Sequence, residues 1–419
     1  MLPPFDKFSG PKTLMSSRTP WSAIRAFIPA TTLRAGALIS IFWISHATAE
    51  PYVPSGKDDI LEVLPTAIAA SEGDRIRSSR EQVEKNPGNV ELAVATALEH
   101  FKRGRIEGDP RFYGYAESAI GHWATDRNPP IEILLIRAHL KQHRHEFKAA
   151  LSDLDDIVKR EPTNAQAWLI KAVVHMVQGD YASARSSCSR LIGSAPEYIA
   201  ATCLSNVVAL SGESEKALSV LKQELVSANG APEQEQLWVI ISIAEIEQRL
   251  GRSEDAERSF RAALAIDSED TYLLTSFADF LLDLQRPAEA EQLLRGRRSN
   301  DALLLRLALV HKQLANREAF VADREELEAR FDANRARGDS SHLREEALFE
   351  LNIKGDAPRA AELALSNWQL QREPFDLRLL AEAGVAAKSS DAIRRAKEWL
   401  TATKLEYPRV STLLNSGAN

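Results

Sequence analysis

The chain has 419 residues, of which 26% are charged and 44% hydrophobic, and this ordinary globular composition excludes a wholly disordered protein. Its formal net charge of -7 argues against a nucleic-acid partner, because a protein that coats phosphate needs a basic surface. Its two cysteines exclude a disulfide-stapled mini-domain and a four-cysteine zinc module.

The first 49 residues have the pattern of a secretory signal peptide. Residues 35–44 carry no charge, arginines precede them, and small residues follow at Ala47 and Ala49. The apolar run is about half the roughly 20 residues that a membrane-spanning helix needs. We therefore expect cleavage after Ala49 and a periplasmic or secreted mature protein without a transmembrane segment. A buried helix and an uncleaved anchor are the alternatives, and Met15 is a second candidate for the true start.

A repeat with a period of about 34 residues organises most of the remaining chain. Ala138 and Ala172 are separated by one such period, as are Ala150 and Ala184. A glycine followed five residues later by an alanine recurs at Gly179/Ala184, Gly212/Ala217, Gly251/Ala256 and Gly355/Ala360. Such self-similarity indicates an array of similar supersecondary units.

Each unit is predicted to be a helical hairpin. Residues 165–178 and 181–192 carry apolar side chains at spacings of three and four, which is one face of a helix. Gly179 separates the two segments, because glycine tolerates the left-handed conformation at a helix end. Pro196 ends the second segment, and Asn164 can cap the first. The repeated alanines are small where paired helices approach closely.

The pattern resembles the tetratricopeptide repeat family. The best copy matches that repeat, in order, at Trp168, Ala172, Ala184, Cys188 and Pro196. The resemblance implies an all-α solenoid of tandem hairpins in a right-handed superhelix, with about ten repeats making roughly one turn. It also implies a concave groove, lined by the first helix of each hairpin, that binds a protein or peptide.

The array is expected to contain ten hairpins, of which the first spans 58–87 and the second spans 88–128 with a long internal loop at 104–110. The expected organisation is a signal peptide (1–49), degenerate amino-terminal hairpins (50–130), a clear repeat array (131–298), divergent carboxyl-terminal hairpins (299–408) and a fraying tail (409–419).

Groove-lining side chains follow from the position of each residue within its repeat. The positions expected to face a partner are His139, Gln142, His143, Gln166, Leu169, Val173, Met176, Val207 and Leu210. His139 and His143 are four residues apart on one predicted helix, which places both imidazoles on one face, as metal sites require. The alternative is a solvated polar pair, since no third ligand is evident.

Cys188 and Cys203 lie symmetrically about the turn at Pro196, and therefore level on adjacent antiparallel helices. In an oxidising compartment they could form a disulfide, and otherwise they would be buried thiols that act as small hydrophobic side chains. The aromatic segment 108–115 has two interpretations as well. It is either a binding loop, or the start of a helix in which Phe112 and Tyr115 pack the core.

We see no catalytic motif: the sequence lacks a glycine-rich phosphate loop after a strand, a G-x-S-x-G elbow and a cysteine–histidine zinc framework. We therefore expect a non-enzymatic scaffold of the bacterial cell envelope, without a cofactor, that binds a peptide or protein in its groove. The alternative function is a metal- or small-ligand-binding envelope protein that uses His139 and His143.

Overall fold

The computed structural model describes residues 71–336 and 342–416, and all named elements within those ranges are helices. This confirms the predicted all-α solenoid. The expected signal peptide lies outside the described residues.

The elements in chain order are α1 (Ser71–Lys85), α2 (Val90–Glu107), α3 (Arg111–Ala119), η3 (Gly121–Trp123), α4 (Ile131–His143), α5 (Phe147–Arg160), α6 (Ala165–Val177), α7 (Tyr181–Ser189), α8 (Glu197–Leu210), α9 (Ser214–Ser227), α10 (Glu233–Arg249), α11 (Ser253–Ile266), α12 (Thr271–Asp283), α13 (Pro287–Leu294), α14 (Asp301–Gln313), α15 (Arg317–Ala336), α16 (Leu343–Phe349), η4 (Glu350–Lys354), α17 (Ala357–Leu370), α18 (Pro374–Ala386), α19 (Ser390–Thr403) and α20 (Pro408–Ser416).

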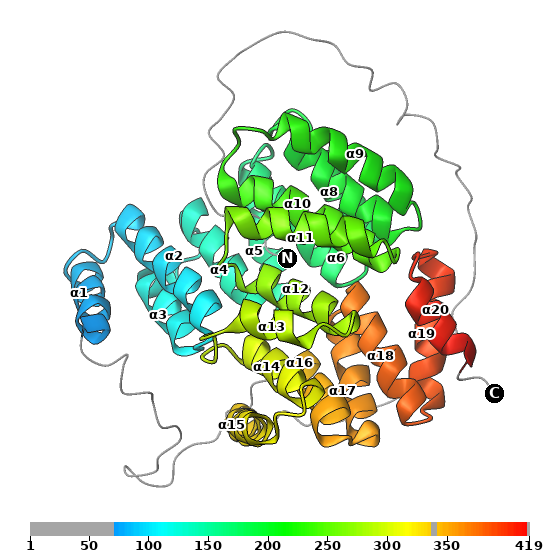
Figure 1. Cartoon of the computed structure of the whole chain (residues 1–419). Coiled ribbons are helices and arrows are strands. Elements are labelled where there is room, and N and C mark those ends of the chain that lie inside the picture. Colours follow the sequence, from blue (N-terminus) through cyan, green and yellow to red (C-terminus); the bar gives the residue numbers. More distant parts are fainter. Residues whose placement is uncertain (1–70, 337–341, 417–419) are drawn as a thin grey trace, which may run out of the picture.

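Successive helices form pairs that follow one another from α2/α3 to α18/α19, as Figure 1 shows from blue to red. The sequence signals act where they were expected. The side chain of Asn164 caps α6 by accepting a hydrogen bond from the Ala167 amide (2.9 Å), and Gly179 follows the helix with φ 76°. Ala172 and Ala184 are fully buried, so this pair packs closely where its side chains are smallest.

Buried polar pairs join the two helices of three hairpins at one spacing. The contacts are Lys141 to Asp153 (2.6 Å), Ser259 to Glu247 (2.7 Å) and His311 to Asp323 (2.6 Å). In each case the partners are twelve residues apart, the same spacing as Ala172 and Ala184. The three carboxylates are almost wholly buried, so these contacts satisfy groups that would otherwise be costly to bury.

The solenoid turns back on itself after five pairs. At its amino-terminal side the end of α2 meets α12, because the Thr271 hydroxyl donates to the Arg105 carbonyl (3.1 Å) and Arg105 pairs with Asp270 (3.4 Å). The side chain of Asn300 also donates to the Arg105 carbonyl (3.3 Å). The superhelix is therefore wound more tightly than the ten repeats per turn that were expected.

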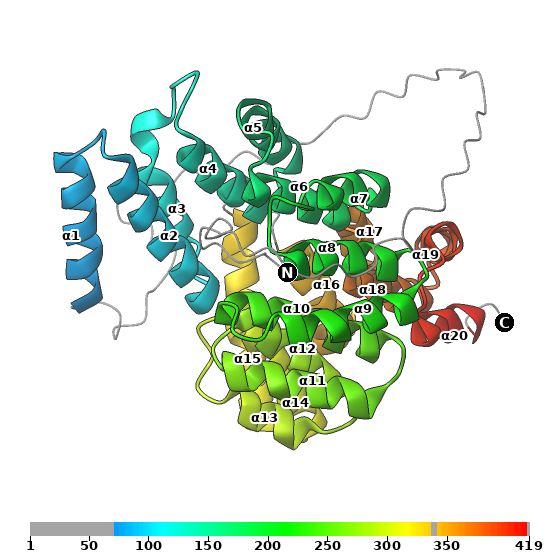
Figure 2. The same ribbon diagram turned by 90° about the horizontal axis from the view of Figure 1, so that it is seen from above.

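The carboxyl-terminal side closes in the same way onto α6/α7 and α8/α9. The amide of Arg372 donates to the Val177 carbonyl at the end of α6 (2.7 Å). The amide of Ser214, in the first turn of α9, donates to the Glu406 carboxylate (2.7 Å). Figures 1 and 2 both show α18 and α19 (orange to red) near the α6–α9 segment.

The structure differs from the expected boundaries near both ends. Helix α2 continues into the expected loop at 104–110 and is followed by Gly108, which has φ 69°. Residues 408–416 form α20 in place of a fraying tail, because Val410 and Leu414 share one helix face and are buried. Of the hairpin expected at 58–87, only α1 lies in the described residues. Those residues contain nine helical pairs, compared with the ten hairpins expected.

The closure can be tested at the glycines of equivalent turns. Gly212 has φ 85°, and a Cβ there would lie 2.5 Å from the Lys404 carbonyl oxygen. Gly251 has φ 78° and no neighbouring atom within 4 Å of its Cβ position. We expect Gly251→Ala to cost about 1–2 kcal/mol of unfolding free energy through backbone strain. Gly212→Ala should cost about 1–3 kcal/mol more, because the added methyl group displaces the docked segment.

Urea denaturation of the two variants measures the difference. Equal losses of stability would show that the Lys404 segment does not rest on the Gly212 turn in solution.

Candidate functional site

The closed solenoid surrounds a cavity of about 930 Å³. Its wall comes mainly from the first helices of the pairs, namely α2, α4, α6, α8, α10, α12, α14, α16 and α18, and Tyr407 completes it after α19. This arrangement matches the expectation that first helices form the concave surface. The volume lies at the upper end of the range for ligand-binding sites, roughly 300–1,000 Å³.

Six arginines of the described residues line the cavity, and five of them form ion pairs with carboxylates. The pairs are Arg105–Asp270, Arg144–Glu117, Arg306–Asp279, Arg344–Asp376 and Arg378–Asp283. The Arg306 and Arg378 pairs are bidentate, with distances between 2.6 and 3.0 Å. Such pairs hold the guanidinium planes in fixed orientations on the cavity wall.

Phe375 lies among three of these arginines. The guanidinium carbons of Arg306, Arg344 and Arg378 lie 5.6, 6.0 and 6.0 Å from its ring centroid. Attraction between a cation and the face of an aromatic ring reaches about this distance. The first turn of α18 therefore gives the cavity a wall that is both apolar and cationic.

Helix α10 contributes a polar strip to another part of the wall. The Tyr272 hydroxyl donates to the Glu245 carboxylate (2.5 Å), and the Asn206 amide donates to the Ser242 hydroxyl (3.0 Å). Burial raises the pKa of Glu245, and this favours its neutral form. The strip offers both donors and acceptors to a ligand.

The structure places some of the predicted groove residues on this wall and not others. The four that line the cavity are His143, Val173, Met176 and Leu210. The five that do not line it are His139, Gln142, Gln166, Leu169 and Val207. A binding role for the first four stays a prediction.

Two of the remaining five positions are wrong as groove residues. Leu169 and Val207 are fully buried and pack in the core between α6, α7, α8 and α10. His139 and Gln142 are buried and do not line the cavity, so they offer a partner no surface there. Gln166 lies in the first turn of α6, whereas only the last turns of that helix reach the cavity.

Residues 133–199 match the family model described as tetratricopeptide repeat. This part of the chain is therefore similar to the tetratricopeptide repeat. It covers the pairs α4/α5 and α6/α7 and the start of α8, which include the copy that carries Trp168 and Ala172. No curated protein matches the chain in sequence.

Solved structures to which the chain is similar also include repeat proteins. PilW, a type IV pilus biogenesis factor, is 16% identical, with 49% of this chain and 95% of that chain covered and a TM-score of 0.39. A tetratricopeptide repeat protein from Parabacteroides merdae is 18% identical, with coverage of 61% and 99% and a TM-score of 0.36. The Rap protein complexed with competence and sporulation factor is 12% identical, with coverage of 78% and 99% and a TM-score of 0.45.

The histidine pair of α4 packs against aromatic rings. The ring centroid of Phe101 lies 6.1 Å from that of His139 and 6.0 Å from that of His143. The ring centroids of His143 and Tyr113 are 3.7 Å apart. Among residues 71–336 and 342–416, no group of three or more His, Cys, Asp or Glu side chains could hold a metal ion. The metal-binding alternative therefore has no third ligand in that part of the chain.

The segment at 108–115 follows the second interpretation given for it. Helix α3 begins at Arg111, and Phe112 is buried with 2% of its surface exposed. Tyr113 lies against Gly104 of α2, where a Cβ would come within 2.9 Å of the tyrosine ring. The segment therefore packs two helices together and contributes Tyr113 to the cavity wall.

Arg249 is a cavity residue outside the predicted set, although the sequence contains a signal for it. Leu210 and Arg249 each stand two residues before a turn glycine, Gly212 and Gly251. They therefore occupy the same place in successive repeats, and both line the cavity. Extending the prediction for Leu210 by one repeat would have found Arg249.

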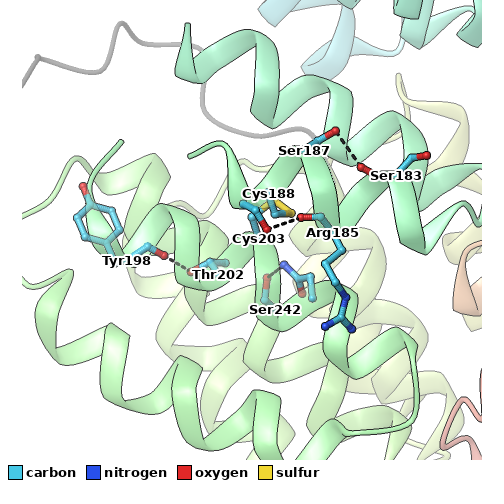
Figure 3. The surroundings of a disulfide bond; sticks show 10 residues. Ser183, Arg185, Ser187, Cys188, Tyr198, Thr202, Cys203 and Ser242 are labelled. Carbon is cyan, nitrogen blue, oxygen red and sulfur yellow. Dashed lines mark hydrogen bonds between the residues drawn. A yellow bond between two sulfur atoms is a disulfide. The ribbon is translucent and has the colours of Figure 1, made fainter. Parts of the chain in front are cut away.

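The two cysteines form a disulfide in the structure, with 5.5 Å between their Cα atoms. The bond, shown in Figure 3, joins α7 to α8, and both cysteines are fully buried. Asn206, about one turn after Cys203 on α8, reaches the cavity. The bond therefore ties a cavity-lining helix to the preceding helical pair.

None of the helices in the described ranges is long and apolar enough to span a membrane.

The burial of His139 predicts a pH dependence of stability. Burial lowers its pKa from 6.5 to about 3, so the folded protein holds it neutral while the unfolded chain takes up a proton below pH 6.5. Stability is therefore lost as the pH falls below about 6.5. His139→Gln should reduce the slope of unfolding free energy against pH by up to about 1.4 kcal/mol per pH unit in this range.

Chemical denaturation between about pH 7 and about pH 5, where histidine ordinarily titrates, measures this slope. Gln142→Leu changes a buried neighbour on the same helix without adding or removing a titrating group, and should leave the slope as it is. An unchanged slope in His139→Gln would contradict the burial of a neutral imidazole.

Proposed function

We propose that the protein is a non-enzymatic scaffold of the bacterial cell envelope that binds a short extended segment of a partner protein inside its cavity. The observation that carries the proposal is the cavity of about 930 Å³, whose wall is formed mainly by the first helices of successive pairs. A space of this size holds a short segment and excludes a folded domain.

The composition of the wall supports a peptide ligand. Met176 and Leu210 present apolar surface, while Asn206 and Thr275 present hydrogen-bonding groups. An extended peptide needs both, because its main chain carries a donor and an acceptor at almost every residue. Since helix packing and ion pairs already fix the wall, a ligand would meet a preorganised surface and avoid part of the ordering cost of binding.

The charged groups of the cavity wall favour a binding role over catalysis, because most of them are already paired with one another. Arg306, Arg344 and Arg378 are each engaged by carboxylates, so the pairs serve to hold one another in place. The buried His311–Asp323 pair resembles part of a catalytic arrangement, but neither residue lines the cavity. The pair joins α14 to α15 instead.

Two observations support a place in the cell envelope. Residues 1–49 have the charge and hydrophobicity pattern of a signal peptide. Cys188 and Cys203 are bonded, and disulfides persist in oxidising compartments such as the periplasm.

Peptide binding can be tested with a displayed library of random peptides of about 12 residues, which are roughly 40 Å long when extended. Thr275 lines the cavity, and we expect Thr275→Trp to fill part of it. Peptides enriched on the wild-type protein should bind Thr275→Trp at least about tenfold more weakly, a difference of roughly 1.4 kcal/mol. Thr401→Trp places the same ring on an exposed site outside the cavity and should bind as the wild type does.

Failure to enrich any peptide would contradict the proposal, and so would peptides that bind both tryptophan variants equally well. Fluorescence anisotropy with the labelled peptides gives the dissociation constants.

Export can be tested on the full chain expressed in a bacterium with two membranes. The protein recovered from the periplasm is expected to begin at Glu50 and to react with a thiol reagent only after reduction and unfolding. Amino-terminal sequencing and mass spectrometry before and after reduction measure both. Recovery from the cytoplasm alone, with residues 1–49 retained and two free thiols, would contradict the proposed location.

A further inference from the structure

Arg249 differs from the other five arginines on the cavity wall. It is 7% exposed, in the last turn of α10, and no carboxylate of residues 71–336 or 342–416 forms an ion pair with it. Its Nη2 atom donates to the Ala209 carbonyl (3.3 Å) and lies 3.5 Å from the Ser214 hydroxyl. Its Nε atom is buried and has no acceptor in the same ranges.

This arrangement is costly for a cation. Hydrogen bonds as long as 3.3 and 3.5 Å are beyond the usual range for N–H···O contacts. A buried charge without a counter-ion loses its hydration and gains little in return. Burial accordingly lowers the pKa of Arg249. An anion supplied by a ligand would remove this cost.

The neighbouring acids do not supply that anion. The Glu245 carboxylate, one turn earlier on α10, already accepts a hydrogen bond from Tyr272 (2.5 Å), and burial raises its pKa. The Glu406 carboxylate accepts from the Ser214 amide at the start of α9 (2.7 Å). Both acids act on Arg249 electrostatically, but neither forms an ion pair with its guanidinium group.

Two phenols complete the surroundings of Arg249. Tyr407 lines the cavity, and both Tyr407 and Tyr181 interact electrostatically with the guanidinium group. Burial raises the pKa of each phenol, so both hydroxyls stay protonated and can donate hydrogen bonds. Of these two phenols, Tyr407 lines the cavity, so the site combines one fixed positive charge with a hydroxyl donor, which is the chemistry that binds an oxyanion.

We propose that the cavity contains an oxyanion-binding subsite centred on the guanidinium group of Arg249. The subsite takes a carboxylate or a phosphate group. This proposal rests on the proposed function and extends it, because it names the chemical group through which the bound segment is held. A segment with a carboxylate near its end would place that group against the part of the Arg249 guanidinium group that faces the cavity, and its main chain along α10 and α12.

Thermal unfolding of the full chain in acetate or inorganic phosphate, compared with chloride at equal ionic strength, tests the subsite. A bound anion stabilises the folded state, and an anion at a few times its dissociation constant should raise the melting temperature by roughly 1–3 °C. Acetate measures recognition of a carboxylate, and phosphate measures recognition of a phosphate group. A rise with either anion supports the subsite and identifies the chemistry of its ligand.

Variants show whether Arg249 is responsible. Arg249→Gln removes the charge and should abolish the rise, while Arg394→Gln, which removes an exposed arginine outside the cavity, should retain it. In chloride, Arg249→Gln is expected to melt no lower than the wild type, because it removes an uncompensated buried charge. If that variant does not fold, Arg249→Lys keeps the charge, loses the planar donor set and should show a reduced rise.

The absence of a rise in the wild type with both anions would overturn the subsite, as would a rise of equal size in Arg249→Gln. These results are independent of the peptide library. Enriched peptides without an anion effect would leave the proposed function and remove the subsite. An anion effect without enriched peptides would leave the subsite as a site for a small anion and remove the peptide-binding function.

Discussion

The rest of the structure depends on the contact between the carboxyl-terminal segment and the turns of the central pairs. Two main-chain amides, those of Arg372 and Ser214, make hydrogen bonds of 2.7 Å across this contact. Without them the inner faces of the first helices would form an open groove. With them the same faces enclose a bounded cavity that has walls on several sides.

The tight winding that permits this contact begins with small residues. Ala172 and Ala184 let the two helices of one pair pack closely. In other pairs, polar contacts such as Lys141–Asp153 join the two helices through residues that are likewise twelve apart in the sequence. Turn glycines then leave room for the approaching segment. The ring of Trp399 lies so close to Gly179 that a Cβ there would be 2.3 Å from it. Side-chain size thus controls both the packing within a pair and the closure of the ring.

The local features of the fold could be predicted from the sequence because they depend on neighbouring residues. The repeat period, the cap at Asn164 and the left-handed glycine at Gly179 act within one repeat or between adjacent repeats. The closure could not be predicted, since its partners are up to 195 residues apart and no pattern links them. The disulfide could be predicted only in part. The positions of Cys188 and Cys203 in the sequence made the bond possible, but the orientation of both side chains in space decides whether it forms.

The candidate site could likewise be predicted only in part from the sequence. Helix periodicity placed Val173, Met176 and Leu210 on the cavity side. It misplaced Leu169, one turn before Val173 on the same face, because only the last turns of α6 reach the cavity, and it misplaced Val207, because a shift of one residue from Asn206 moves a side chain from the cavity to the core. The arginines of the cavity are distinguished only by partners on other helices. Arg249 and Arg306 have the same chemistry in the sequence and different surroundings in the fold.

The hydrogen bond between Ser214 and Glu406 has a consequence for how the protein unfolds. An open solenoid has contacts only between neighbours, so its ends can fray while its middle stays folded. Here an acidic side chain near the carboxyl terminus satisfies an amide in the first turn of a helix 192 residues earlier. The last helices and the middle of the array therefore lose contacts together when either one melts. Such long-range coupling raises the contact order of the chain, slows its folding and makes its unfolding more cooperative than that of a linear array.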